Sequence, residues 1–190
     1  MDEAGLDELL RRARARDPEA LTRLVEFYSA RVFGLLYRLT RTRDAAEDLL
    51  QETFLRVVRA LGQYEHVGKF EAWLFRIAAN LARDRARAQR RRGDAAPVGD
   101  WDVDEARGAG RHAAPPGDPE QRLVDREQGE RLARAVARLS DAEREIILLR
   151  HYSELSFREI ADVLGVPLGT ALARAHRALA RLRQELADRD

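Results

Sequence analysis

The strongest chemical signal in the sequence is a one-sided row of positive charges along residues 69–92. The segment carries a net charge of +6, and its polar side chains recur at helical spacing opposite an apolar stripe. A solvated helix face usually mixes both signs, so this density of one sign indicates a surface for a nucleic-acid backbone. The row consists of Lys69, Arg76, Asn80, Arg83 and Arg87.

Asn80 and the aromatic residues before the row offer contacts to bases. The amide of Asn80 has a donor and an acceptor for a base edge, although an ordinary surface amide is the simpler interpretation of that residue alone. Tyr64 and Phe70 flank the loop that enters the basic helix, whereas Trp73 and Phe75 are predicted to lie in the core. Aromatic faces beside cationic grooves hold single-stranded bases by stacking, at about 1–3 kcal/mol for each base.

An acidic face precedes these residues at 44–52, where four acids occur without a base. Acids at the start of a helix complement its dipole, which is the simpler interpretation. Because these acids extend into the second turn, we favour a docking face for a basic partner. The face comprises Asp44, Asp48, Gln51 and Glu52, and Phe54 follows on the apolar side of the same helix.

A helix-turn-helix pattern occupies residues 156–183. A helix over 157–164, the turn Gly165-Val166-Pro167 and a second helix from Leu168 fit this motif. A recognition helix in the major groove needs a packed back and a basic front. The predicted back is Ala171, Ala175, Ala178, Leu179 and Leu182, and the predicted front is Thr170, Arg174, Arg177 and Arg181 with His176 at its flank. An ordinary helical hairpin is the weaker alternative, because residues 168–183 contain four arginines and no acid.

Start signals throughout the chain make an all-α fold the expected class, since no alternating strand pattern accompanies them. The signals are Asp17-Pro18-Glu19, Asp118-Pro119-Glu120, the capping box of Ser140 with Glu143 and that of Ser156 with Glu159. Residues 93–118 contain five glycines, three prolines and six acids, a composition typical of disorder. We therefore predict two small helical domains, 17–92 and 119–187, joined by a flexible acidic linker at 93–118.

Composition excludes several classes of protein. The 190 residues contain no cysteine, so disulfide scaffolds and thiol nucleophiles are excluded. Charges interrupt every apolar run and no secretory signal begins the chain, so we expect a cytoplasmic protein without membrane insertion. The four histidines are dispersed and no catalytic motif occurs, so we expect no enzyme activity, no metal site and no cofactor.

Three segments, in this order, resemble the extracytoplasmic-function (ECF) sigma factors of the bacterial sigma-70 family. Residues 48–54 (DLLQETF) resemble the motif that binds core RNA polymerase. Residues 70–80 (FEAWLFRIAAN), continuing into the basic helix, resemble the segment that melts and captures the minus-ten promoter element. Residues 157–176 resemble the helix-turn-helix that reads the minus-thirty-five element.

The resemblance implies sigma region 2 over 17–92 and sigma region 4 over 119–187. Region 2 is then expected on the clamp helices of the largest polymerase subunit, region 4 on the flap of the second, and both on promoter DNA. An anti-sigma factor commonly holds such proteins, although no residue here identifies one. The implied sites are Asp44, Asp48, Gln51, Glu52 and Phe54 for polymerase; Tyr64, Lys69, Phe70, Arg76, Asn80, Arg83 and Arg87 for the minus-ten element; and Ser156, Arg158, Thr170, Arg174, His176, Arg177 and Arg181 for the minus-thirty-five element.

One departure and one alternative accompany this interpretation. Leu172 and Ala173 stand where the family usually has a basic residue and a hydroxyl, so we expect fewer phosphate contacts there. The alternative is a stand-alone helix-turn-helix transcriptional regulator, which would dimerise on palindromic half-sites and has no use for the acidic face. The sigma-factor hypothesis requires that Arg83, Arg87, Arg174 and Arg177 project outward and are not buried in internal ion pairs.

Overall fold

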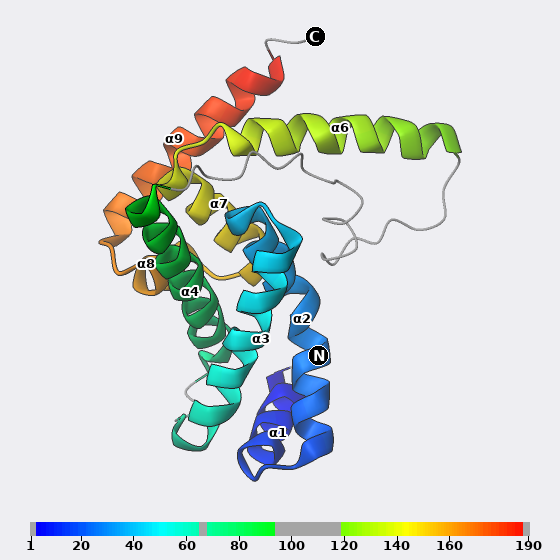
Figure 1. The fold of residues 1–190 in the computed structure, drawn as a ribbon, viewed down its shortest axis with the longest axis vertical. Coiled ribbons are helices and arrows are strands. Elements are labelled where there is room, and N and C mark those ends of the chain that lie inside the picture. The colour runs from blue at the N-terminus through cyan, green and yellow to red at the C-terminus, as the bar shows by residue number, and fades with distance from the viewer. Residues whose placement is uncertain (1–2, 65–67, 94–118, 188–190) are drawn as a thin grey trace.

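The computed structural model describes residues 3–64, 68–93 and 119–187, which form two groups of helices (Figure 1). The first group contains α1 (Glu3–Arg14), α2 (Pro18–Thr40), α3 (Arg43–Ala60), the short 3-10 turn η1 (Leu61–Gln63) and α4 (Phe70–Arg92). The second contains α6 (Pro119–Ala137), α7 (Asp141–Ser153), α8 (Phe157–Leu164) and α9 (Leu168–Ala187). The described residues include no strand, so the predicted all-α class is confirmed.

Side-chain caps fix where several of these helices begin. Oδ1 of Asp17 accepts hydrogen bonds from the backbone N–H groups of Glu19 and Ala20 at 3.0 and 3.4 Å, so α2 begins at Pro18 as predicted. Ser156 caps α8, because its Oγ accepts from the N–H of Glu159 at 3.3 Å while the Glu159 carboxylate accepts from the N–H of Ser156 at 2.8 Å. The predicted cap at Asp118 and the predicted linker after Gly93 lie outside the described residues.

Helix α1 is an element that the sequence analysis did not predict. Its Leu9, Leu10 and Ala13 are buried, and α1 packs against α2 and η1. Leu6, Leu9, Leu10 and Ala13 follow helical spacing in the sequence, but the helix is short and rich in charge and depends on α2 to cover this apolar stripe. The first helical group therefore begins before residue 17.

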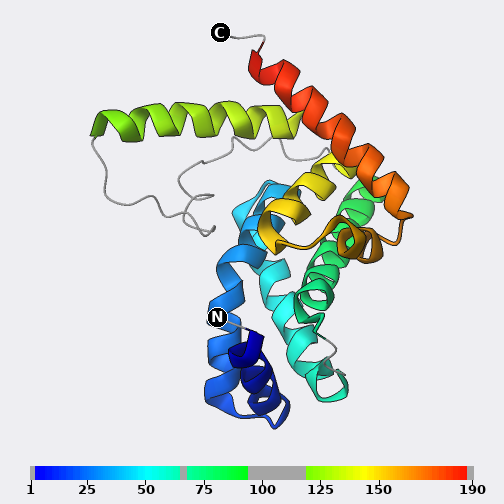
Figure 2. The same ribbon diagram turned by 180° about the vertical axis from the view of Figure 1, so that it is seen from behind.

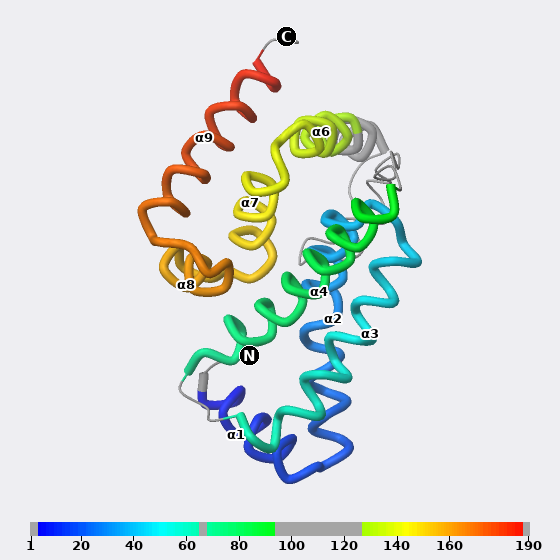
Figure 3. The backbone as a smooth tube through the Cα atoms, turned by 60° about the vertical axis from the view of Figure 1, so that its left-hand side comes forward, coloured from blue at the N-terminus to red at the C-terminus, as the bar shows by residue number. Residues whose placement is uncertain are grey.

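The two groups of helices pack against each other. Helix α7 contacts α2 and α4, and α8 contacts α4, so α2 and α4 form the side of the first group that faces the second (Figures 2 and 3). At this junction Nε of the buried Arg31 donates to the backbone carbonyl of Tyr152 at 2.8 Å, and NH1 of Arg31 pairs with Glu71 at 2.8 Å. Nε of Arg38 donates to the Tyr152 hydroxyl at 2.9 Å. The sequence predicts two domains joined by a flexible linker and does not indicate this contact.

Candidate polymerase and nucleic-acid interfaces

The acidic face of α3 is accessible. Asp44, Asp48 and Gln51 are exposed, and Glu52 is half-buried beside Arg56, whose Nε lies 2.6 Å from its Oε1. Phe54, predicted among the polymerase-binding residues, is only 7% exposed, because it packs in the core beneath the face. In this structure Phe54 therefore supports the helix that presents the acids and is not itself a contact surface.

The basic row of α4 divides into an open part and a covered part. Lys69, Arg76, Asn80 and Arg87 are exposed, and Arg87 pairs with its neighbour Asp84 at 2.7 Å. Arg83 does not project outward as predicted. Its side chain is 33% exposed, and its Nε lies 3.1 Å from Oε1 of Glu145 on α7.

Hydrogen bonds also hold the Arg83 side chain against α4 and α8. NH2 of Arg83 donates to Oδ1 of Asn80 at 2.6 Å and to the backbone carbonyl of Val163, at the end of α8, at 3.3 Å. Arg83, Arg87, Arg174 and Arg177 were expected to project outward. For Arg83 this expectation is wrong, because the packing of α7 and α8 on α4 brings oxygen acceptors over its side chain.

The aromatic residues before α4 form a stacked wall. The rings of Tyr64 and Trp73 are 4.6 Å apart at 24°, and burial raises the pKa of the Tyr64 hydroxyl. Phe70 is only 1% exposed and meets Trp73 at 5.7 Å from inside the core, so it supports this wall and does not reach solvent. Trp73 was predicted in the core; it is half-buried, packs against the core and forms the stack with Tyr64, which is also half-buried.

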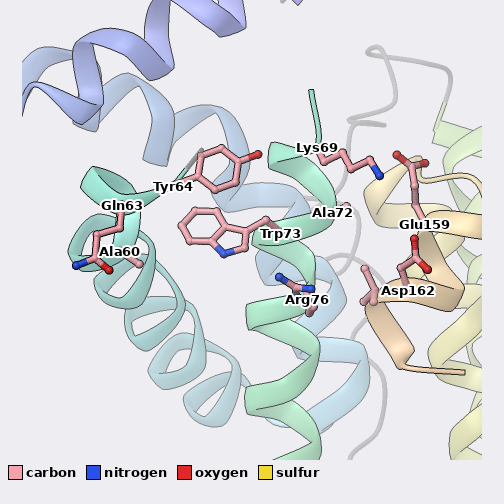
Figure 4. Close-up of a pocket in the computed structure, with 10 residues that line it drawn as sticks. Ala60, Gln63, Tyr64, Lys69, Ala72, Trp73, Arg76, Glu159 and Asp162 are labelled. Carbon is pink, nitrogen blue, oxygen red and sulfur yellow. The ribbon is translucent and has the colours of Figure 1, made fainter. Parts of the chain in front are cut away.

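A cleft of about 720 Å³ lies between this wall and α8 (Figure 4). Tyr64, Trp73, Lys69 and Arg76 line one side, and acidic residues of α8 line the other. Lys69 and Glu159 extend toward one another across it, and the attraction of Lys69 helps lower the pKa of Glu159, although the hydrogen bond from Ser156 is the larger cause. The cleft has the aromatic wall and the cations of a nucleotide site, but Glu159 and Asp162 place negative charge opposite them.

The recognition helix α9 has the predicted apolar back with one exception. Ala171, Ala175, Ala178 and Leu182 are buried, whereas Leu179 is 44% exposed. The prediction for Leu179 is wrong because the side chain lies at the edge of the packed face, where α6 to α8 do not cover it. Leu172 is also exposed, at 45%.

The basic row of α9 runs along the seam between α9 and α7 and not along its outermost face. Arg174 is half-buried, and it acts electrostatically on Glu145. Nε of Arg177 lies 3.8 Å from Oε1 of Glu143, and NH1 of Arg181 lies 2.9 Å from Oε2 of the same residue. The Arg177 and Arg181 side chains keep 58% and 55% of their surface exposed, so both remain accessible to a phosphate.

Glu143 is a residue of this surface that sequence reasoning identified only as a helix cap. Its buried carboxylate accepts from the backbone N–H of Ser140 at 3.2 Å and from the Ser140 hydroxyl at 2.7 Å. These hydrogen bonds, followed by the charges of Arg181 and Arg177, lower its pKa. One carboxylate thus joins the start of α7 to the basic row of α9. The helical period of the sequence alone could not reveal this link, since Glu143 and Arg181 lie 38 positions apart on different helices.

The remaining predicted residues of the helix-turn-helix lie at its accessible edge. Ser156 and Arg158 are exposed at the start of α8, His176 is exposed on α9, and Thr170 is half-buried. Gly165 ends α8 with a φ of 66°, a left-handed conformation that favours glycine, and so permits the tight turn into α9.

The described part of the chain contains neither a membrane-spanning helix nor a metal-binding cluster. No helix there is long and apolar enough to cross a membrane. No cluster of three or more histidine, aspartate or glutamate side chains there is arranged to hold a metal ion.

Comparisons with known proteins match both halves of the chain. Residues 24–92 match the family "Sigma-70 region 2", and residues 129–182 match "Sigma-70, region 4". The ECF RNA polymerase sigma factor SigW of Bacillus subtilis is 30% identical over 98% of this chain and 99% of its own length. The RNA polymerase sigma factor CarQ of Myxococcus xanthus is 36% identical over 94% of this chain and 96% of its own.

Two solved structures share the fold. CnrH, in complex with the cytosolic domain of CnrY, superposes with a TM-score of 0.66 at 24% identity, covering 96% of this chain and 97% of that one. RpoE of Bartonella quintana, in complex with the anti-sigma factor NepR, superposes with a TM-score of 0.65 at 24% identity, covering 89% of this chain and 98% of that one. With family matches in both halves and relatives aligned over nearly its whole length, the chain belongs to the ECF sigma factors of the sigma-70 family.

Proposed function

We propose that this chain binds core RNA polymerase and directs it to promoters that carry minus-ten and minus-thirty-five elements. The observation that carries the proposal is that the two family matches coincide with three charged surfaces. The region 2 match spans an exposed acidic face on α3 and a basic row on α4, and the region 4 match spans a helix-turn-helix with a basic row on α9.

Each surface has a role in this proposal. The acids Asp44, Asp48 and Glu52 dock region 2 on the clamp helices of the largest polymerase subunit, where opposite charge sets the orientation of the two proteins. The stack of Tyr64 on Trp73 receives unpaired bases of the minus-ten element. Phe70 and Phe54 support these surfaces from within the core.

Region 4 reads the upstream element in the same proposal. The N-terminal part of α9 lies in the major groove, and Thr170, Arg174 and His176 are placed near base edges while Arg177 and Arg181 contact phosphates. Ser156 and Arg158, at the start of α8, contact the flanking backbone. The same domain rests on the flap of the second polymerase subunit.

The proposal also covers location, partners and chemistry. The protein acts in the cytoplasm, beside the polymerase and the chromosome, and it contributes no catalysis of its own because the polymerase makes the RNA. The solved relative RpoE is in complex with an anti-sigma factor. An anti-sigma factor is therefore a proposed partner of this chain as well.

Run-off transcription with core polymerase across a genomic promoter library tests the function. We expect a discrete set of transcripts whose start sites share two upstream elements, and co-elution of the chain with core polymerase. Specific binding of the isolated chain to a palindromic duplex, without stimulation of the polymerase, would instead support a stand-alone helix-turn-helix regulator.

A further inference from the structure

Three exposed leucines lie in a line along α9. Among the described residues, five large apolar side chains are more than a third exposed, and three of these belong to this helix: Leu168, Leu172 and Leu179. Spacings of four and seven residues bring side chains to the same side of a helix. Single exposed leucines are ordinary on a protein surface, but an aligned set indicates a contact surface.

Leu172 is the leucine of this line that is turned furthest from the core. The buried side of α9 is formed by Ala171, Ala175, Ala178 and Leu182. At about 100° per residue, Leu172 points about 90° away from the middle of that side, whereas Leu168 and Leu179 lie nearer to its edge. The exposed His176 follows Leu172 one turn later. Leu172 therefore faces a ligand that lies along the outer side of the helix.

Arginines occupy the other flank of the same outer side. Arg177 follows Leu172 by five residues, which places it about 140° further round the helix. Arg177 and Arg181 approach Glu143 of α7, yet more than half of each arginine side chain is exposed. The exposed residues between the two flanks have short side chains: Gly169, Ala173 and Ala180. This outer side lies at the edge of the second helical group, as Figure 3 shows.

The start of α9 has few groups that could hydrogen-bond to a base. Residues 168–173 (LGTALA) contain one polar side chain, that of Thr170, and it is half-buried. A recognition helix contacts base edges with its N-terminal residues, so the side chains available there are mainly apolar. In the major groove the apolar group of an A·T pair is the C5 methyl of thymine. Leu172 matches that methyl group in chemistry and in position.

The charge of α9 favours DNA over a protein as the occupant of the leucine flank. Residues 168–183 contain four arginines and no acid, so a second copy of this helix would oppose its own charge. DNA supplies phosphates for the arginine flank and methyl groups for the leucine flank in the same groove. One ligand thus satisfies both flanks of the helix.

We propose that Leu172, with Leu168 one turn before it, contacts thymine methyl groups in the major groove of the upstream element, so that the chain selects A·T pairs there by an apolar contact. This inference rests on the proposed function of α9 as the minus-thirty-five surface and specifies what that surface selects. An apolar contact releases no counterions. It therefore sets the preferred sequence and leaves the salt dependence of binding to the arginines.

Deoxyuridine tests this contact, because it pairs as thymine does and lacks only the C5 methyl group. Holoenzyme assembled from the full chain and core polymerase is titrated with the strongest promoter found by run-off transcription. Each thymine of its minus-thirty-five element, on both strands, is replaced in turn by deoxyuridine. We expect one or two of these replacements to weaken binding by about two- to fivefold, the loss of one buried methyl contact, without a change in the salt slope.

Leu172→Ala and a matched control complete a double-mutant cycle. Leu172→Ala is expected to weaken binding to the thymine promoter by about the same factor and to abolish the effect of deoxyuridine at those positions. Leu132→Ala removes a leucine of similar exposure on α6. It should bind the thymine promoter as the wild type does and keep the full effect of deoxyuridine. Because both leucines are exposed, both variants are expected to fold, and thermal unfolding and co-elution with core polymerase verify this.

The outcomes separate this inference from the proposed function. Equal binding of the thymine and deoxyuridine promoters by the wild type overturns the inference, as does an undiminished deoxyuridine effect in Leu172→Ala. Loss of polymerase binding in Leu172→Ala would assign the leucine to a protein contact and also overturn it. In all three cases the proposed function stands. Failure of run-off transcription overturns the function instead, and the full chain then selects duplexes from random pools made with thymine or with deoxyuridine. Better recovery of the thymine pool, dependent on Leu172, supports the inference, and equal recovery overturns it.

Discussion

The ring of Tyr152 lies so close to Gly34 that a Cβ atom on Gly34 would stand 2.4 Å from Cε1 of the tyrosine. The two residues belong to different helical groups, α7 and α2, and they are separated by more than a hundred positions in the sequence. Glycine here serves close approach and not a special backbone conformation, since it lies within a regular helix. The junction of region 2 with region 4 thus depends on the absence of one methyl group.

Gly34→Ala is expected to loosen this junction. The added Cβ forces the buried Tyr152 ring to move, and overpacking of this kind typically costs about 1–3 kcal/mol in the free energy of unfolding. Urea denaturation followed by circular dichroism measures the loss. Gly62→Ala is the matched control, because a Cβ there meets nothing within 4 Å, and a loss as large as that of Gly34→Ala would contradict the prediction.

Glu143→Gln is expected to remove a pH-dependent part of the stability. Ser140 and the two arginines lower the pKa of Glu143 from its ordinary value of 4.5. A carboxyl group with a depressed pKa in the folded state stabilises the protein above its unfolded pKa, and this contribution disappears as the pH falls through the folded pKa. The wild type should therefore exceed Glu143→Gln by about 1 kcal/mol at pH 7, and the difference should shrink below pH ~4.5.

Urea titrations from pH 7 to pH 3 measure this difference. Glu159→Gln provides the comparison, because Glu159 belongs to an equivalent capping box on α8 but forms no ion pair with the described residues of α9. Glu143, unlike Glu159, pairs with arginines of the basic row of α9. Only Glu143→Gln should therefore also weaken binding to the upstream element. A stability difference that stays constant with pH would mean that the carboxylate charge contributes nothing.

Local features of this fold were predictable from the sequence, because the groups that determine them are close in the chain. Asp17 and Ser156 begin helices at the predicted positions through bonds to backbone N–H groups two or three residues away. The buried alanines of α9 follow from helical period and residue size. The expected fold class depends on these features alone and is confirmed.

Features that depend on long-range packing were not predictable in the same way. Arg31 looks like any surface arginine in the sequence, yet it is 4% exposed because Tyr152 and Glu71 arrive from elsewhere in the chain to accept its hydrogen bonds. Arg83 likewise fits the period of an exposed row until α7 packs over it. Helical period tells which residues share a face, but not which faces meet.

Asp48→Arg is expected to abolish binding to core polymerase while leaving the melting temperature nearly unchanged. The Asp48 side chain is 71% exposed, and its nearest cation, Arg85, lies 3.9 Å away, so the residue contributes little to folding. Reversal of its charge places a cation where the proposal requires an acid for a basic partner. Co-elution with core polymerase and thermal unfolding measure the two effects.

Asp7→Arg, on α1, makes the same change of charge outside the acidic face and serves as the control. We expect it to retain polymerase binding. If both variants bind the polymerase as the wild type does, the acidic face is not the docking surface. If both lose binding, net charge is responsible and not the position of Asp48.

Arg174→Ala and Arg177→Ala are expected to affect DNA binding in different ways. Arg174 is half-buried and held near Glu145, an arrangement that suits a fixed contact to a base edge, whereas the Arg177 side chain is 58% exposed and suits a phosphate. Arg174→Ala should cost about 1–3 kcal/mol on the preferred upstream element and little on altered sequences. Arg177→Ala should weaken binding to all sequences alike and reduce the salt slope by about 1.

Holoenzyme titrations of promoter variants at several salt concentrations distinguish these two roles. Arg134→Ala is the matched control, because Arg134 is an exposed arginine of region 4 that pairs with Glu130 on its own helix, α6, and does not belong to the basic row of α9. It should leave both the affinity and the salt slope unchanged. An equal loss on every sequence after Arg174→Ala would assign Arg174 to the DNA backbone. The discrimination of the upstream element would then depend on the exposed side chains of α9, of which Leu172 can contact a thymine methyl group and His176 can hydrogen-bond to a base edge.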